Sequence, residues 1–167
     1  LWYIYLGITL ACAFSFRMAG MSWFDAFAHS FSTVAIGGFS TYDASIGYFD
    51  SIQIEVITML FMYIAGINFA LHFTAFRHLS FKRYLSDPEY KGYTLIILTS
   101  ILIVSSYLYF NEIAAGWQEA LRYGSFQVIS IGTTAGFAST DFTVWPAFLP
   151  IFLILLSYIG GSAYSTG

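Results

Sequence analysis

The sequence predicts an all-α integral membrane protein built from two tandem repeats, each a helix, a re-entrant hairpin and a second helix. Apolar residues make up 58% of the chain and charged residues only 9%, whereas an ordinary soluble domain has roughly 25% charged residues. The apolar runs 52–76 and 93–110 approach or exceed the roughly 18 to 20 residues that cross a membrane as a helix. Segment 34–43 also resembles segment 132–141, which lies 98 residues further on.

The first repeat is predicted over residues 1–76 and begins with a membrane-spanning helix over 1–18. Residues 22–41 follow as a hairpin that is too short to cross the membrane twice and too apolar for an ordinary loop. We expect a half-membrane helix, N-capped by Ser22, that returns as extended chain. Lipid tolerates such backbone only where protein or a water-filled cavity satisfies its polar groups. A spanning helix over 52–76 completes the repeat.

The connection over residues 77–91 holds four of the six Lys and Arg residues. Short loops rich in Lys and Arg stay in the cytoplasm, so this connection is predicted to be cytoplasmic. The chain is then a multi-pass membrane protein whose hairpins enter from the outside. Acidic residues outnumber basic ones on that side and predict a mouth that attracts cations: Asp25, Asp43, Asp50, Glu112, Glu119 and Asp141.

The second repeat is predicted over residues 92–167. It contains a spanning helix over 93–110, a hairpin over 116–140 whose half-helix is about one turn longer than the first, and a third helix over 144–159. Gly66 and its counterpart Gly161, 95 residues later, predict a kink in the last helix of each repeat.

The two repeats face the same way, because each contains two full crossings. Such copies suit rotation about an axis along the membrane normal, and two of them supply only half a ring around it. A half ring would expose backbone to lipid, so we expect further repeats to close it. The sequence begins without methionine and stops in a glycine-rich stretch, which indicates a fragment of a longer protein.

The hairpin tips are the candidate functional sites. A cation leaving water needs fixed oxygens in place of its hydration shell, and closely spaced backbone carbonyls provide them. Glycine permits the backbone angles that turn such carbonyls inward, and the aromatic residue after it would brace the strand from behind. Simple close packing of small residues is the alternative, but two copies in register favour an ion pathway. The predicted ion-binding residues are Ala35, Ile36, Gly37, Gly38 and Phe39, and Thr133, Thr134, Ala135, Gly136 and Phe137.

Other polar residues lie in apolar segments. Glu55, Asn68 and His72 could relay ions or protons, but hydrogen bonds between helices explain them equally well, and His29 is expected to bond loop backbone. The sequence has no His/Cys cluster, nucleophile triad or phosphate-binding glycine motif, so we do not expect an enzyme. Its net charge of −3 forms no basic face for nucleic acid.

The tips resemble a known family. Residues 32–41 and 130–140 are similar to the second and third selectivity filters of the TrkH/KtrB-type potassium transporters, and the resemblance covers essentially the whole chain. It implies four potassium-channel-like repeats around a pseudo-fourfold pore, of which this chain is the central part. It also implies potassium as the transported ion, no other cofactor, a homodimer in the lipid of the bacterial inner membrane with the hairpins entering from the periplasmic side, and a cytosolic nucleotide-binding ring as regulatory partner.

Two departures from potassium channels accompany this resemblance. Thr134 keeps the threonine found two residues before the channel glycine and Ile36 does not, while Ser40 and Ala138 replace the second channel glycine, so fewer ion sites are implied. The end of the chain resembles the family's intramembrane gating loop, although Tyr164 is larger than expected there. This predicted loop comprises Gly160, Gly161, Ser162, Ala163, Tyr164, Ser165, Thr166 and Gly167.

Three alternatives stay open. A two-pore-domain potassium channel also has two hairpins per chain, but the missing second glycines speak against it. A secondary carrier with alternating access would bind its substrate at a broken helix near the membrane midplane. A nonconducting membrane scaffold would use the duplicated tips for packing alone.

Overall fold

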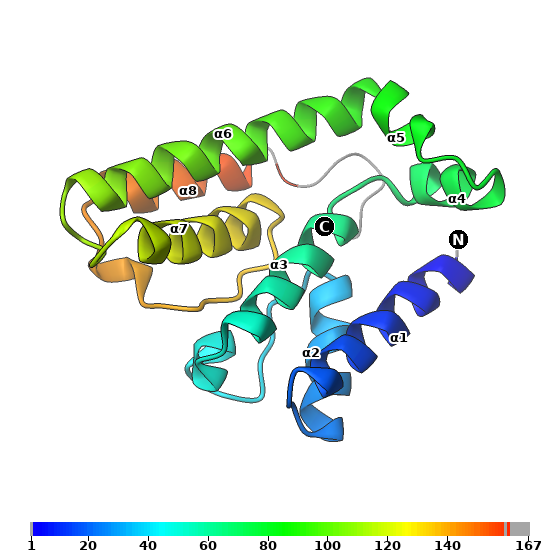
Figure 1. Cartoon of the computed structure of the whole chain (residues 1–167), viewed down its shortest axis with the longest axis horizontal. Helices are drawn as coiled ribbons and strands as arrows, with labels where there is room; N and C mark the ends of the chain where they lie inside the picture. The colour runs from blue at the N-terminus through cyan, green and yellow to red at the C-terminus, as the bar shows by residue number, and fades with distance from the viewer. Residues whose placement is uncertain (1, 159, 161–167) are drawn as a thin grey trace.

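The computed structural model describes residues 2–158 and 160, and they form a helical protein (Figure 1). Most of the helices form from apolar runs, and several of them begin at a residue whose side chain caps the first turn. The described helices, including two short 3₁₀ helices (η), are α1 (Trp2–Met18), α2 (Trp23–Val34), η1 (Ser45–Phe49), α3 (Ile52–Ala65), α4 (Phe69–Arg77), α5 (Lys82–Ser86), α6 (Pro88–Phe110), α7 (Trp117–Gly132), η2 (Phe142–Val144) and α8 (Phe148–Ser157).

The two repeats have the same arrangement. In each, a long first helix packs on a half-helix, which in turn packs on the last helix: α1, α2 and α3 in the first repeat and α6, α7 and α8 in the second. Figure 1 shows α6 running above α7 and α8, with α3 between α7 and the pair α1 and α2. The contact between α3 and α7 therefore joins the repeats.

The helix expected over residues 52–76 is not continuous. It is divided into α3 and α4, whose axes are bent by 91° at the break. Gly66 ends α3, and the Asn68 side chain caps α4 by accepting a hydrogen bond from the Ala70 N–H at 2.8 Å. The kink predicted at Gly66 is thus a full change of direction, because an N-cap two residues later starts a new helix.

The first helix of the second repeat begins earlier than expected. The Asp87 carboxylate accepts a hydrogen bond from the Tyr90 N–H at 2.8 Å, and Pro88 occupies the first turn. A capping Asp followed by Pro is a typical helix start, so α6 extends back into the 77–91 connection. Its 23 residues make it the one unbroken helix of the described chain that is long and apolar enough to cross a membrane, and the bent pair counts as a second if taken together.

The last helix of the second repeat starts later than expected, at Phe148. The chain before it forms η2 and a turn through Pro146, which lacks the N–H that a helix interior requires. In the predicted gating loop only Gly160 is described, and residues 161–167, including the expected kink at Gly161, lie outside the described residues.

Candidate functional site

Each hairpin tip directly follows one of the two half-helices. Ser22 caps α2 as predicted, since its hydroxyl oxygen accepts a hydrogen bond from the Asp25 N–H at 3.0 Å. α2 has 12 residues and α7 has 16, which matches the expected difference of one turn. Both half-helices end directly before a tip, which we define as the first tip (residues 35–39) and the second tip (residues 133–137).

Each tip holds two residues in the left-handed region of backbone space. In the first tip these are Ile36 with φ 51° and Gly38 with φ 65°, and in the second Thr134 with φ 68° and Gly136 with φ 85°. Positive φ is a genuine outlier for a β-branched residue, and such strain persists only where the surrounding structure imposes it. The same strained pattern therefore occurs at matched positions of both repeats.

The two tips are in direct backbone contact although they lie 98 residues apart in sequence. A Cβ atom added to Gly38 would overlap the carbonyl oxygen of Ala135 and lie 3.1 Å from the carbonyl carbon of Gly136. A Cβ added to Gly136 would meet no atom of the described residues within 4 Å. One glycine is thus closed in by the opposite tip, and the other faces open space.

Asp25 ties the returning strand of the first hairpin to its half-helix. Its carboxylate accepts hydrogen bonds from the hydroxyls of Ser22 at 2.7 Å, Thr41 at 3.2 Å and Tyr42 at 3.3 Å. Only 7% of Asp25 is exposed. It therefore belongs to the interior of the hairpin, which corrects its assignment to the solvated acidic mouth.

A fully buried polar residue in each half-helix reaches the returning strand. His29 Nδ1 donates to the Asp25 carbonyl at 2.8 Å, and in the neutral ring Nε2 accepts from the Ser40 hydroxyl at 2.9 Å. Gln127, 98 residues later, donates from Nε2 to the Thr140 carbonyl at 3.3 Å. His29 thus bonds a helix carbonyl and a side chain of the returning strand, so the expected bond to loop backbone was wrong. Sequence reasoning missed the role of Gln127, although the 98-residue offset from His29 could have found it.

The two tip phenylalanines differ in their surroundings. Phe137 is fully buried and stacks on His29 of the first repeat with 6.3 Å between ring centres, whereas Phe39 is 83% exposed. Phe137 is therefore packed against the other repeat, the described residues do not cover Phe39, and the brace expected from both rings stays a prediction. Ser130 also supports the second tip by donating to the Phe137 carbonyl at 2.6 Å.

The other polar residues of the apolar segments are held by hydrogen bonds or ion pairs. Glu55 is paired with Arg122, and the Asn68 side chain caps α4. His72 bonds the Ile64 carbonyl at 2.9 Å and the Tyr84 hydroxyl at 2.8 Å. Within residues 2–158 and 160, no group of three or more His, Cys, Asp or Glu side chains could hold a metal ion.

The fold defines the class of protein: an all-helical membrane protein in which a helix, a hairpin with a half-helix and a strained tip, and a second helix occur twice. A family model described as "Cation transport protein" matches residues 1–167. The chain belongs to this family, the TrkH family, which is a family of transporters and not of enzymes.

Individual relatives agree with this assignment. The chain is 49% identical to the Trk system potassium uptake protein TrkH of Vibrio parahaemolyticus and 47% identical to the protein of that name from Halomonas elongata. All of this chain is matched in both, but it spans only 35% and 34% of their lengths. The crystal structure of the potassium transporter TrkH from Vibrio parahaemolyticus superposes with a TM-score of 0.96, over 99% of this chain and 36% of that one.

Proposed function

We propose that this chain is the second and third repeat of a potassium uptake protein, and that the two tips form half of its selectivity filter. Potassium is then bound by the backbone carbonyls of residues 35–39 and 133–137. The names of the relatives, which describe potassium uptake, support the choice of ion.

One observation carries the proposal, namely the backbone contact between two strained, duplicated tips. The Ala135 carbonyl lies beside the α-carbon of Gly38, so a peptide oxygen of one repeat lies against the backbone of the other. Neutral carbonyls in this arrangement replace the water around a dehydrated potassium ion. The C-terminal ends of α2 and α7 carry partial negative charge, which favours a cation near the tips that follow them.

The complete pore requires more chain. Phe137 is covered by His29 of the preceding repeat, so by the same geometry the exposed Phe39 would pack on a repeat that precedes this chain. We infer four repeats around one pore, with the 77–91 connection in the cytoplasm, the hairpins entering from the periplasm and residues 160–167 as a gate below the filter. A homodimer and a cytosolic nucleotide-binding ring follow from the family resemblance.

Rubidium uptake into liposomes by the full-length protein, with sodium as competitor, tests the filter. Gly38→Ser and Gly136→Ser are both expected to lower uptake or selectivity against sodium. Assembly, which size-exclusion chromatography would check, should stay intact in Gly136→Ser, whereas the Cβ that Gly38→Ser adds would overlap the Ala135 carbonyl. Unchanged transport in both variants would overturn the filter assignment.

A secondary carrier is the second candidate, because the 91° break between α3 and α4 resembles the broken helices that bind substrates in carriers. The polar groups at this break are already engaged, since Asn68 caps α4 and His72 bonds Ile64 and Tyr84. Unitary ion currents from the reconstituted full-length protein would favour the filter, and obligatory exchange without currents would favour the carrier.

A further inference from the structure

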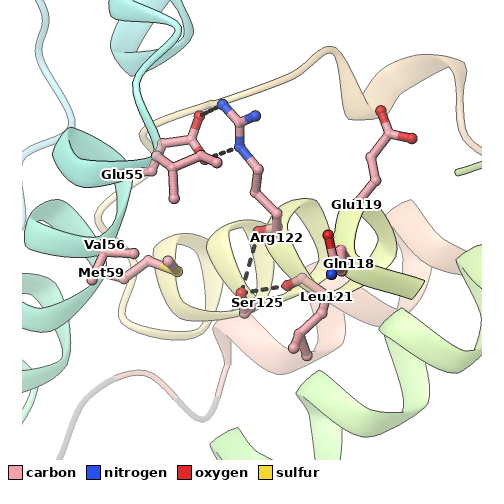
Figure 2. A pocket seen from close by; sticks show the side chains of 9 residues that line it. Glu55, Val56, Met59, Gln118, Glu119, Leu121, Arg122 and Ser125 are labelled. Carbon is pink, nitrogen blue, oxygen red and sulfur yellow. Dashed lines mark hydrogen bonds and ion pairs between the residues drawn. The ribbon is translucent and has the colours of Figure 1, made fainter. Parts of the chain in front are cut away.

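An ion pair between a buried glutamate and a partly exposed arginine crosses the border between the two repeats. Glu55 lies in the first turn of α3 and is 1% exposed, and Arg122 lies in the first half of α7. Arg122 donates from Nε to Glu55 Oε2 and from a terminal nitrogen to Glu55 Oε1, each at 2.7 Å. Figure 2 shows the two side chains reaching toward each other from neighbouring helices.

The geometry makes this pair a specific one. Two parallel hydrogen bonds between a guanidinium and a carboxylate fix both distance and orientation. The carboxylate also lies near the N-terminus of α3, where the helix dipole favours negative charge. A second acid, Asp50, lies 3.4 Å from Arg122, but its side chain is 90% exposed. Exposed pairs of this kind contribute little, so the interaction is carried by Glu55.

Apolar packing does not replace the pair at this end of the helices. A cavity of about 560 Å³ opens between α3 and α7, lined on one side by residues such as Val56 and Met59 and on the other by Leu121 and Ser125 (Figure 2). Glu55 and Arg122 bridge this hollow. Glu119, which also lines it, is already engaged by the Ala115 N–H at 2.6 Å.

The same two helices meet again at the second tip. A Cβ added to Gly66, at the end of α3, would lie 3.2 Å from the Thr133 Cγ2 at the start of that tip. Gly66 follows Glu55 by 11 residues, and Thr133 follows Arg122 by 11 residues. The same alignment of α3 with α7 therefore produces both the ion pair and the tip contact. The two contacts lie about 16 Å apart along the helices, because an α-helix rises 1.5 Å per residue.

We propose that Glu55 and Arg122 are positioning residues that set the register of α7 on α3 and thereby the ion selectivity of the second tip. This inference rests on the proposed function of the tips as a filter. If α7 slides or tilts on α3, the second tip at its C-terminal end moves with it. Carbonyl oxygens that replace hydration water must stay in fixed positions. The pair thus couples the last helix of one repeat to the filter of the next.

The test uses the full-length protein in liposomes and measures rubidium uptake with and without sodium. Glu55→Gln and Arg122→Gln each leave a polar partner without its counter-charge and are expected to lower selectivity for rubidium over sodium about threefold to tenfold. Arg122→Lys keeps the charge but loses the fork geometry and is expected to lose less. The exchange Glu55→Arg with Arg122→Glu is expected to restore part of the selectivity, which a merely structural disturbance would not do.

Ser125→Ala is the matched control, because Ser125 lines the same cavity three residues after Arg122 and its hydroxyl bonds carbonyls of its own helix, and its selectivity should equal that of the wild type. Gly136→Ser separates the two proposals. If Gly136→Ser changes selectivity and the variants of Glu55 and Arg122, including the mild Arg122→Lys, do not, the positioning role is overturned while the filter stands. If no variant at the tips or the pair changes selectivity, both proposals fall. Equal loss in the single variants and the exchange variant would also contradict the positioning role.

Discussion

Gly38 lies against the carbonyl group of Ala135 so closely that no side chain fits between them. The contact joins the tips of two hairpins that are far apart in sequence and alike in backbone conformation. Because Gly136 faces open space at the matching position, the two glycines are required for different physical reasons, and this difference can be measured.

Gly38→Ala should harm the protein more than Gly136→Ala. Both changes place an L-residue at positive φ, which costs about 1–2 kcal/mol. Only the methyl group at position 38 also overlaps a backbone oxygen of the opposite tip, and backbone cannot move aside cheaply. We expect the Gly38 variant to lose most rubidium uptake and the Gly136 variant to keep a measurable part, both normalised to reconstituted protein. Equal loss in the two variants would contradict the close contact between the tips.

His29 and Gln127 should differ in their contributions to stability. His29→Ala removes two hydrogen bonds of 2.8 and 2.9 Å and the ring on which Phe137 stacks, so we expect a loss of about 2–4 kcal/mol. Gln127→Met removes one longer bond together with a buried Oε1 atom that has no partner among the described residues, so the change should stay within about 1 kcal/mol. Thermal denaturation of the full-length protein in detergent would compare them. A larger loss for Gln127→Met would contradict this ranking.

Gly66→Ala should disturb the break between α3 and α4, and a second substitution should relieve the disturbance. A Cβ at position 66 would collide with the hydroxyl of Tyr93 and crowd Thr133. Tyr93→Phe removes that hydroxyl at the cost of one long hydrogen bond of 3.3 Å to the Tyr63 carbonyl, about 0.5–1.5 kcal/mol. The double variant is therefore expected to be more stable than Gly66→Ala alone in the same denaturation assay. A double variant that is no more stable would show that the clash lies elsewhere.

The sequence predicts what is local or repeated. The Ser22 cap, the two half-helices and the glycine-bearing tips follow from residue types and from the offset between the repeats. The early start of α6 is also readable from Asp87 and Pro88, which form a typical helix start.

Features that depend on the approach of distant segments could not be predicted in this way. Glu55 is recognisable in the sequence as an unusual residue in an apolar helix. Its partner Arg122 is 67 residues away, and the local sequence around Glu55 does not predict this partner. The exposure of Phe39 and the burial of Phe137 likewise depend on which neighbouring repeat is present. The burial of Asp25 could not be foreseen because its partners Thr41 and Tyr42 lie on the returning strand.

Asp141, which follows the second tip, should keep its charge in mildly acidic solution. The hydroxyl and the N–H of Thr143 both bond its carboxylate and lower its pKa below the usual value for aspartate. A lowered pKa means that the carboxylate stays ionised to lower pH than a free aspartate, so its attraction for cations is lost only when the pH falls through that lowered pKa.

We expect Asp141→Asn to reduce rubidium uptake at low ionic strength, with the effect shrinking in high salt because exposed charges are screened. Thr143→Val removes the hydroxyl bond and should move the acid limb of the pH profile of uptake upward. A profile that is unchanged in Thr143→Val, or a salt-independent effect of Asp141→Asn, would contradict an electrostatic role for this carboxylate at the mouth.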